Sequence, residues 1–67
     1  MKDFGRRLHE LRKERGLSLT ALAKVLDINH STLLRWERGE MAPSIIHLYN
    51  LATYFGVSSD YLIVLED

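Results

Sequence analysis

The sequence contains no cysteine, a single proline and no long apolar run. Without cysteine there is neither a disulfide framework nor a thiolate metal site, and without about 18 consecutive apolar residues no membrane-spanning helix is expected. The 67 residues, 46% of them hydrophobic, are expected to form one domain, residues 1–67, near the lower size limit for an unassisted core. The start, MKDFGRR, has a helical pattern rather than that of a signal peptide, so a cytoplasmic protein is expected.

The sequence also lacks a net charge, because nine Lys and Arg residues balance nine Asp and Glu residues. The two signs are separated along the chain. Residues 1–38 hold all nine basic residues and five acidic ones and carry +4, whereas residues 39–67 hold four acidic residues and carry −4. A dipolar domain of this kind can present one end to phosphate groups while its other end is repelled.

Features of an enzyme are missing as well. The histidines at positions 9, 30 and 47 lie 21 and 17 positions apart, so they form no His-x-x-x-His pair for a metal. The four glycines are isolated and make no phosphate-binding loop. His30 and Ser31 are adjacent, but their side chains would point about 100° apart on a helix, with no third group to orient them. No enzymatic activity, metal or cofactor is expected.

Two helix-sized apolar patterns, in residues 17–39, are separated by too few residues for anything but a tight turn. The first helix should follow Ser18 as N-cap, and its apolar positions recur at helical spacing: Leu19, Leu22, Ala23 and Leu26. Asp27 can adopt the left-handed conformation that the turn requires at modest cost, and Ile28 should lie beneath the turn. Two short helices that cross around a small residue, here Ala23, form a helix-turn-helix.

The second helix is expected over about residues 30–38, with Asn29 as N-cap and Gly39 at its end. Leu33 and Trp36 should point inward, so the opposite face is available for the major groove of DNA. The residues expected to contact bases are His30, Ser31, Leu34 and Arg35. The residues expected to contact phosphates are Ser18, Thr20, Lys24, Asn29 and Arg38.

The segment GLSLTALAKVLDINHSTLLRWERGEMAPS resembles the Xre/Cro type of helix-turn-helix, the phage-repressor-like DNA-binding domains of bacteria and their viruses. RKERGLS, STLLRWERG, the Pro43-Ser44 pair and FGVSSDYL carry the most specific part of the resemblance, which covers nearly the whole chain. It implies an all-α, five-helix, phage-repressor-like fold with a central helix-turn-helix. It further implies that Arg12 and Glu37 form a partly buried, bidentate ion pair that holds the second helix of the motif against the first helix of the domain.

The sequence departs from the family pattern at three positions. Leu19 stands where the family often has a phosphate-contacting Gln, Asp27 where it usually has Gly, and Leu34 where it often has a small polar residue. The missing Gln removes one expected phosphate contact at the start of the helix over residues 19–26.

Three flanking helices complete the expected fold. One runs over about residues 2–15, with an inward stripe of Phe4, Leu8 and Leu11 and an end at Gly16. The next follows Ser44 as N-cap, runs to about residue 55 and ends at Gly56, with these residues inward: Ile45, Leu48, Leu51, Ala52 and Phe55. The last is expected over residues 61–65 after the N-cap Ser58, with Leu62 and Leu65 closing the core.

Apolar residues that this arrangement leaves outside form a larger patch than a small monomer usually exposes. They are Ile46, Tyr49, Tyr54, Tyr61, Ile63 and Val64. A dimer interface is expected at Ile46, Tyr49, Tyr61, Ile63 and Val64.

The sequence therefore predicts a homodimeric, sequence-specific regulator of transcription, a repressor, that binds double-stranded DNA at an inverted repeat with half-sites about 34 Å apart. The alternative is a protein-interaction module of antitoxin or adaptor type that retains the helix-turn-helix frame. The neutral net charge of the sequence and the missing Gln favour the protein-interaction module, whereas Arg35, Arg38 and the charge asymmetry favour the DNA-binding regulator.

Overall fold

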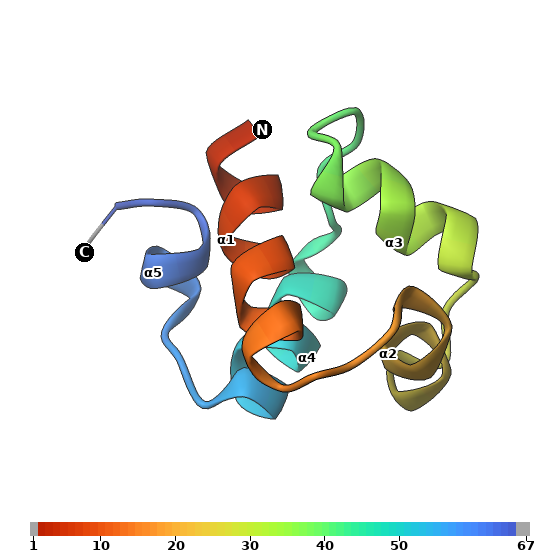
Figure 1. Ribbon diagram of the computed structural model, residues 1–67. Helices are drawn as coiled ribbons and strands as arrows, with labels where there is room; N and C mark the ends of the chain where they lie inside the picture. The colour runs from red at the N-terminus through yellow and green to blue at the C-terminus, as the bar shows by residue number, and fades with distance from the viewer. Residues whose placement is uncertain (1, 66–67) are drawn as a thin grey trace.

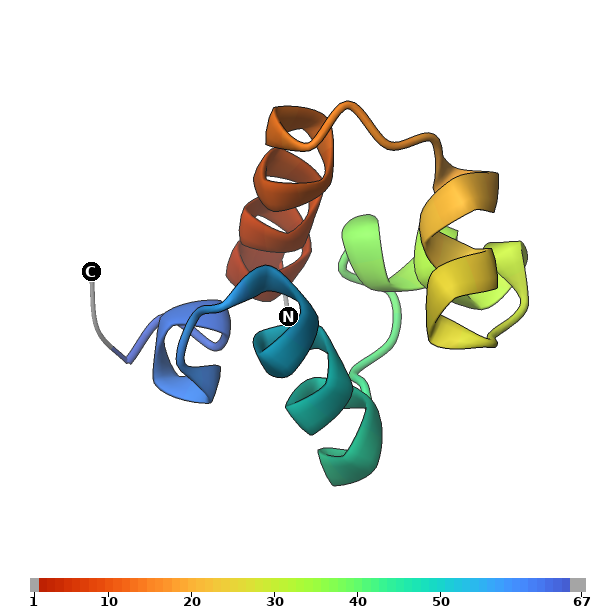
Figure 2. The ribbon, with the colours of Figure 1, turned by 90° about the horizontal axis from the view of Figure 1, so that it is seen from below.

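The computed structural model describes residues 2–65, which form five helices and no strand. The helices are α1 (Lys2–Glu14), α2 (Leu19–Leu26), α3 (His30–Glu37), α4 (Ile45–Phe55) and α5 (Ser59–Leu62). Figures 1 and 2 show α1 and α4 in the middle, with α2 and α3 on one side of them and α5 on the other. The expected all-α, five-helix fold is confirmed, and none of the described helices is long and apolar enough to cross a membrane.

Four of these helices begin at the N-caps that the sequence predicts. Each cap residue has an extended backbone, and its side-chain oxygen accepts a hydrogen bond from a backbone N–H in the first turn; the caps are Ser18, Asn29, Ser44 and Ser58. Such a bond satisfies one of the backbone donors that a helix start leaves unpaired. The caps therefore fix where the helices begin within a chain of only 67 residues.

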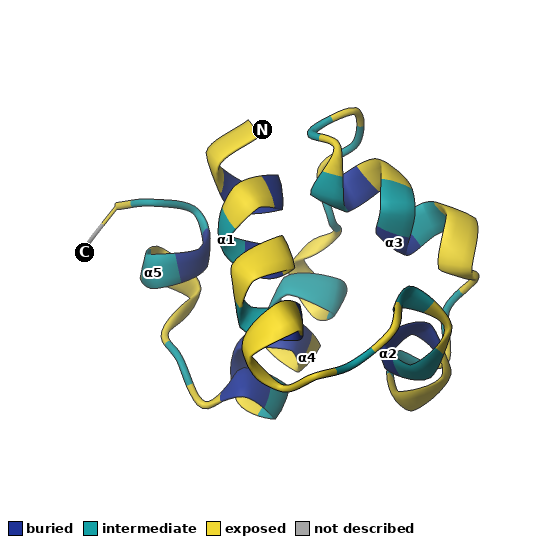
Figure 3. Cartoon of the chain, viewed as in Figure 1, coloured by how far each residue is buried: buried dark blue, intermediate teal, exposed yellow. Residues whose placement is uncertain are grey.

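The core draws at least one residue from every helix. Its members are Phe4, Leu8, Leu22, Ala23, Leu33, Trp36, Leu51, Ala52, Phe55 and Leu62. Figure 3 shows these buried stretches on the inward sides of the helices. Four further positions that were predicted to point inward are partly buried and pack against this core: Leu11, Leu19, Leu26 and Leu48.

The structure corrects the prediction at Ile45, which is 86% exposed rather than buried. Ile45 is the first residue of α4, and Figure 2 shows this end of the helix projecting beyond the neighbouring elements. Helical periodicity gives the direction of a side chain but not whether another element lies there to cover it. Ile45 therefore adds to the exposed apolar surface of α4.

The last helix also differs from its prediction. It begins at Ser59, directly after its N-cap, and ends at Leu62, where residues 61–65 were expected to be helical. Val64 adopts a left-handed conformation with φ of 65°, and the Leu65 N–H donates to the Asp60 carbonyl at 2.8 Å, which closes the helix. Leu65 consequently leaves the face of Leu62 and is 73% exposed, so it does not close the core.

Tyr54 does not belong to the exposed patch. It is half-buried, and its ring meets the ring of Phe55 edge to face with centroids 5.0 Å apart. The Arg15 guanidinium lies 5.5 Å from the Tyr54 ring centroid and donates to the Phe55 carbonyl at 3.2 Å. Arg15 thus covers part of the end of α4, which explains why the Tyr54 ring is only partly exposed.

Candidate nucleic-acid interface

The turn between α2 and α3 has the geometry that the sequence predicts. Asp27 is left-handed, with φ of 56° and ψ of 47°. The Asp27 N–H donates to the Lys24 carbonyl at 3.2 Å, and the Ile28 N–H donates to the Ala23 carbonyl at 3.0 Å. Ala23 itself is 3% exposed, which lets the two short helices approach closely. The α2–turn–α3 unit is therefore closed by backbone bonds and a small buried residue.

The two faces of α3 differ sharply. Leu33 and Trp36 are buried, and Leu34 is half-buried. The remaining predicted DNA-contacting residues on this helix and at its end are exposed: His30, Ser31, Arg35 and Arg38. Positions 31, 35 and 38 fall at i, i+4 and i+7 and share one side of the helix. The structure thus brings a hydroxyl and two guanidinium groups onto one exposed face.

Cations dominate this face because the carboxylate of α3 is used elsewhere. Neither Arg35 nor Arg38 makes an ion pair or a side-chain hydrogen bond with another residue of the described range 2–65. Glu37 lies on the inner side, where its side chain is 6% exposed and pairs with Arg12. The exposed face of α3 consequently carries uncompensated positive charge, which suits a polyanionic ligand.

The helix starts beside this face supply further donors. Ser18 Oγ accepts the Ala21 N–H at 3.0 Å, and Asn29 Oδ1 accepts the Ser31 N–H at 2.9 Å. Both cap residues are exposed, so the Ser18 hydroxyl hydrogen and the Asn29 amide NH₂ are available to a group outside the chain. Thr20 and Lys24 are exposed on α2. Arg38, the fifth predicted phosphate-contacting residue, is exposed as well.

Arg12 joins three segments of the chain. Its Nε donates to Glu37 Oε2 at 2.7 Å, its Nη2 to Glu37 Oε1 at 3.1 Å, and its Nη1 to the Leu17 carbonyl at 2.8 Å. Arg12 is 7% exposed and is the buried charged residue within the described chain. The bidentate contact connects the end of α3 to α1, and the third bond holds the loop that leads to α2.

His9 contributes to the same cluster, a contact that the sequence patterns did not predict. Its Nδ1 lies 2.8 Å from Glu37 Oε1, and half of its side chain is exposed. The same Nδ1 lies 3.2 Å from Arg12 Nη2, so the imidazole contacts both partners of the ion pair. The i, i+3 spacing of His9 and Arg12 on one helix face was the sequence signal that could have identified it.

Gly5 allows the end of α3 to approach α1. A Cβ atom at this position would lie 2.5 Å from the Glu37 carbonyl oxygen and 2.6 Å from that of Trp36. Contacts this short do not occur for real Cβ atoms, so the two backbones meet where only glycine fits. A glycine inside an otherwise helical pattern was the signal for this contact.

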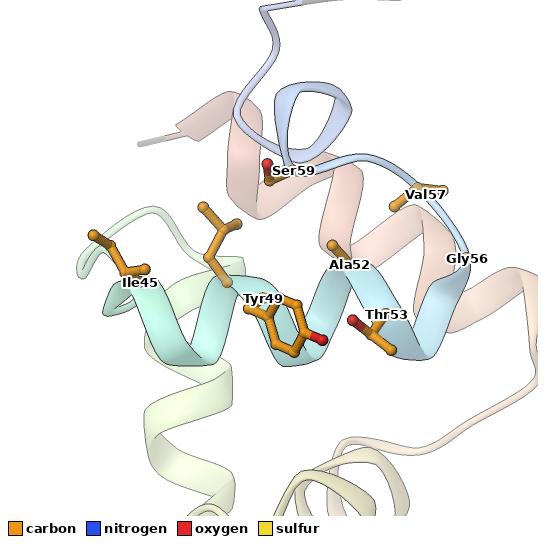
Figure 4. A pocket seen from close by; sticks show the side chains of 8 residues that line it. Ile45, Tyr49, Ala52, Thr53, Gly56, Val57 and Ser59 are labelled. Carbon is orange, nitrogen blue, oxygen red and sulfur yellow. The ribbon is translucent and has the colours of Figure 1, made fainter.

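A second surface lies on α4 and the segment that leads to α5. Ile45, Ile46 and Tyr49 are 86%, 71% and 68% exposed. Beside them is an open groove of about 490 Å³, shown in Figure 4, lined by Ile45, Leu48, Tyr49, Ala52, Thr53, Gly56, Val57 and Ser59. Of the predicted interface residues, Tyr49 lines this groove, and Ile46 is exposed on the same helix. Tyr61, Ile63 and Val64 are half-buried near the end of the chain.

Tyr61 is also tied to α1. The Arg7 guanidinium stacks 4.3 Å from the Tyr61 ring centroid, and Arg7 Nη1 donates to the Tyr61 carbonyl at 2.9 Å. One face of the ring is therefore covered by a cation, and α5 is fixed to α1.

No group of three or more potential metal ligands occurs among residues 2–65.

The fold and the α2–α3 unit define a helix-turn-helix protein. The helix-turn-helix family HTH_3 matches residues 8–62, and the chain belongs to this family, which comprises DNA-binding domains of the Xre type and is not enzymatic. A relative, the HTH-type transcriptional regulator DdrOP3 of Deinococcus deserti, is 42% identical over 52 residues, which are 78% of this chain. The chain spans 40% of the length of that relative.

Two solved structures are closely similar over most of the chain. The restriction-modification controller protein C.AhdI of Aeromonas hydrophila superposes with a TM-score of 0.81 at 34% identity, over 91% of this chain and 92% of that one. SinR, the master regulator for biofilm formation, crystallised in complex with DNA, gives a TM-score of 0.81 at 34% identity, over 90% of this chain and 97% of that one. Both likenesses extend well beyond the helix-turn-helix itself.

The buried ion pair gives a test of stability. Glu37→Ala leaves the Arg12 guanidinium buried without its carboxylate, and we expect a loss of about 3 to 5 kcal/mol in the free energy of unfolding. Glu10→Ala is the matched control, because it removes an exposed partner 4.0 Å from Arg6 and should change stability by less than about 1 kcal/mol. Urea and thermal unfolding measure both. Equal melting temperatures for Glu37→Ala and the unaltered protein would show that the pair does not stabilise the fold.

Proposed function

We propose that this chain binds specific double-stranded DNA as a homodimeric transcriptional repressor in the cytoplasm, with α3 as recognition helix in the major groove. The exposed, uncompensated Arg35 and Arg38 on α3 carry the proposal, because the acidic residue of that helix is turned inward. The SinR structure, which matches 90% of this chain, was crystallised in complex with DNA. This likeness supports the proposal that α3 docks on DNA.

Base contacts are assigned to the outer side of α3. Arg35 can donate two hydrogen bonds to O6 and N7 of guanine, the commonest specific contact in the major groove. His30 and Ser31 lie at the start of the helix, where recognition helices approach base edges most closely. Leu34 offers apolar contact, best matched by a thymine methyl group.

Phosphate contacts are assigned to groups around α3. The capping residues Ser18 and Asn29 use their oxygens as acceptors and keep their own donors available, and the helix starts that they cap attract anions. Thr20, Lys24 and Arg38 add a hydroxyl and two cations. Contacts of this kind position a protein on DNA without reading its sequence.

Self-association is assigned to α4, α5 and the residues after α5. The exposed apolar residues and the groove of Figure 4 are uncharged, and in Figures 1 and 2 α5 lies on the side of the molecule away from α3. A second copy is the occupant that we propose, because one eight-residue helix in one groove reads few base pairs and a linked second copy raises affinity without new contact types. The interface residues are Ile46, Tyr49, Tyr61, Ile63 and Val64, with Ile45 added by its exposure.

Selection from random duplex DNA tests the base contacts. The unaltered protein should enrich an inverted repeat, and Arg35→Ala should lose discrimination at one base pair in each half-site, worth about 1 to 3 kcal/mol. Failure of the unaltered protein to enrich any sequence at low salt would favour a protein-interaction module. Unchanged selectivity in Arg35→Ala would contradict the docking of α3.

Salt dependence tests the phosphate contacts. Arg38→Ala should weaken specific and non-specific DNA about equally, and it should reduce the slope of log affinity against log salt by about one. Lys13→Ala is the control, because it removes an exposed cation on α1 and should leave the slope unchanged. Fluorescence anisotropy at several salt concentrations measures both variants. A loss confined to one sequence would assign Arg38 to base reading instead.

Sedimentation of the free protein at tens of micromolar, with footprinting of a selected site, tests the dimer. Ile46→Glu places a charge in the proposed interface at an exposed position, so it should yield folded monomers with weaker DNA binding. Val25→Glu, a change at an exposed residue of α2 outside that interface, should leave the dimer intact. A protein that stays monomeric on DNA, or a footprint without two-fold symmetry, would remove this interface.

A further inference from the structure

Asn29 and Ser31 form a hydrogen-bonded unit at the start of α3. Asn29 Oδ1 accepts the Ser31 backbone N–H at 2.9 Å and lies 2.6 Å from Ser31 Oγ. A backbone N–H can only donate, so the amide atom that it meets is the oxygen, and the orientation of the Asn29 amide is fixed. Two oxygens 2.6 Å apart need a hydrogen between them, and an amide oxygen has none. The Ser31 hydroxyl is therefore the donor in this contact.

A serine hydroxyl has one hydrogen, so the bond to Asn29 leaves Ser31 with lone pairs alone for any ligand. We propose that Ser31 reads DNA purely as a hydrogen-bond acceptor and selects a base that presents an exocyclic amino group in the major groove. Asn29 is the positioning residue that imposes this polarity. The proposal rests on the proposed function and specifies which base edges α3 accepts at this position.

The edges of the bases in the major groove show what such an acceptor discriminates. Adenine N6 and cytosine N4 are donors, whereas guanine offers the acceptors N7 and O6 and thymine offers O4. A serine that can rotate its hydroxyl freely pairs with either kind. Ser31 could meet guanine or thymine only by breaking its short bond to Asn29, so we expect those bases to be disfavoured about fivefold.

Paired selections with the full chain identify the base pair concerned. The unaltered protein should enrich adenine or cytosine at one position of each half-site, and Ser31→Ala should lose the preference at that position alone. Duplexes that carry purine in place of adenine, or pyrimidin-2-one in place of cytosine, then remove only the amino group. The unaltered protein should lose about fivefold in affinity on the matching analogue, and Ser31→Ala should lose nothing.

Two substitutions at Asn29 distinguish its effect on the Ser31 hydroxyl from its effect on folding as the N-cap of α3. Asn29→Gly keeps an acceptable N-cap but frees the hydroxyl, so guanine and thymine should become tolerated at the Ser31 position. Asn29→Asp retains two acceptor oxygens, so it should keep the preference for the amino group while binding all sequences more weakly, because its charge repels phosphate. Circular dichroism checks the fold of both, and Asn29→Asp carries the test if Asn29→Gly does not fold.

Three results would overturn the inference while leaving the proposed function intact. The first is enrichment of an inverted repeat that has guanine or thymine at the Ser31 position. The second is an unchanged profile for Ser31→Ala, and the third is an unchanged preference in Asn29→Gly. Absence of any enriched sequence with the unaltered protein would instead overturn the proposed function, and this inference with it.

Discussion

The attachment of the C-terminal end of α3 to α1 determines what the rest of the molecule can present. Arg12 and Glu37 are paired out of solvent, and Gly5 lets the carbonyls at the end of α3 contact the backbone of α1. A buried ion pair compensates the loss of hydration only when its geometry is good and its remaining donors are satisfied. Here the guanidinium makes a bidentate contact and also binds the Leu17 carbonyl, so the arrangement meets that condition.

The basic residues of the chain fall into two groups, those that make contacts within the fold and those that are available to a ligand. Three arginines serve the fold: Arg12 pairs with Glu37, and Arg7 and Arg15 donate to carbonyls at the ends of α5 and α4, where the helix dipole favours cations. The count of +4 over residues 1–38 therefore mixes structural cations with available ones. The proposed DNA contact depends on the charges of α3 alone and not on this total. The carboxylate of α3 points inward, whereas Arg35 and Arg38 point outward.

Local patterns in the sequence were enough for the first four helices, the N-caps and the left-handed Asp27, because these depend on neighbours within about four positions. Errors arose where exposure depends on distant parts of the chain. Ile45 fits the helical period of α4, yet no element covers it, and the left-handed Val64 turns Leu65 away from the core. The contacts of Gly5 and His9 with α3 span about thirty positions, so the helical period of α1 alone did not identify their partners on α3.

The helix α1 contacts both α3 and α5, which lie on opposite sides of it. It anchors α3 through Arg12 and anchors α5 through Arg7, whose guanidinium stacks on Tyr61. In the proposed dimer, the two recognition helices are thus connected to the self-association surface by packed helices rather than by a flexible linker. The separation of the two α3 helices is then a property of the fold, whose Cα atoms extend over 28 × 23 × 20 Å. Since half-sites repeat with the turn of DNA, about 34 Å, a rigid connection makes their spacing part of what the proposed dimer recognises, in addition to the bases proposed to contact each α3.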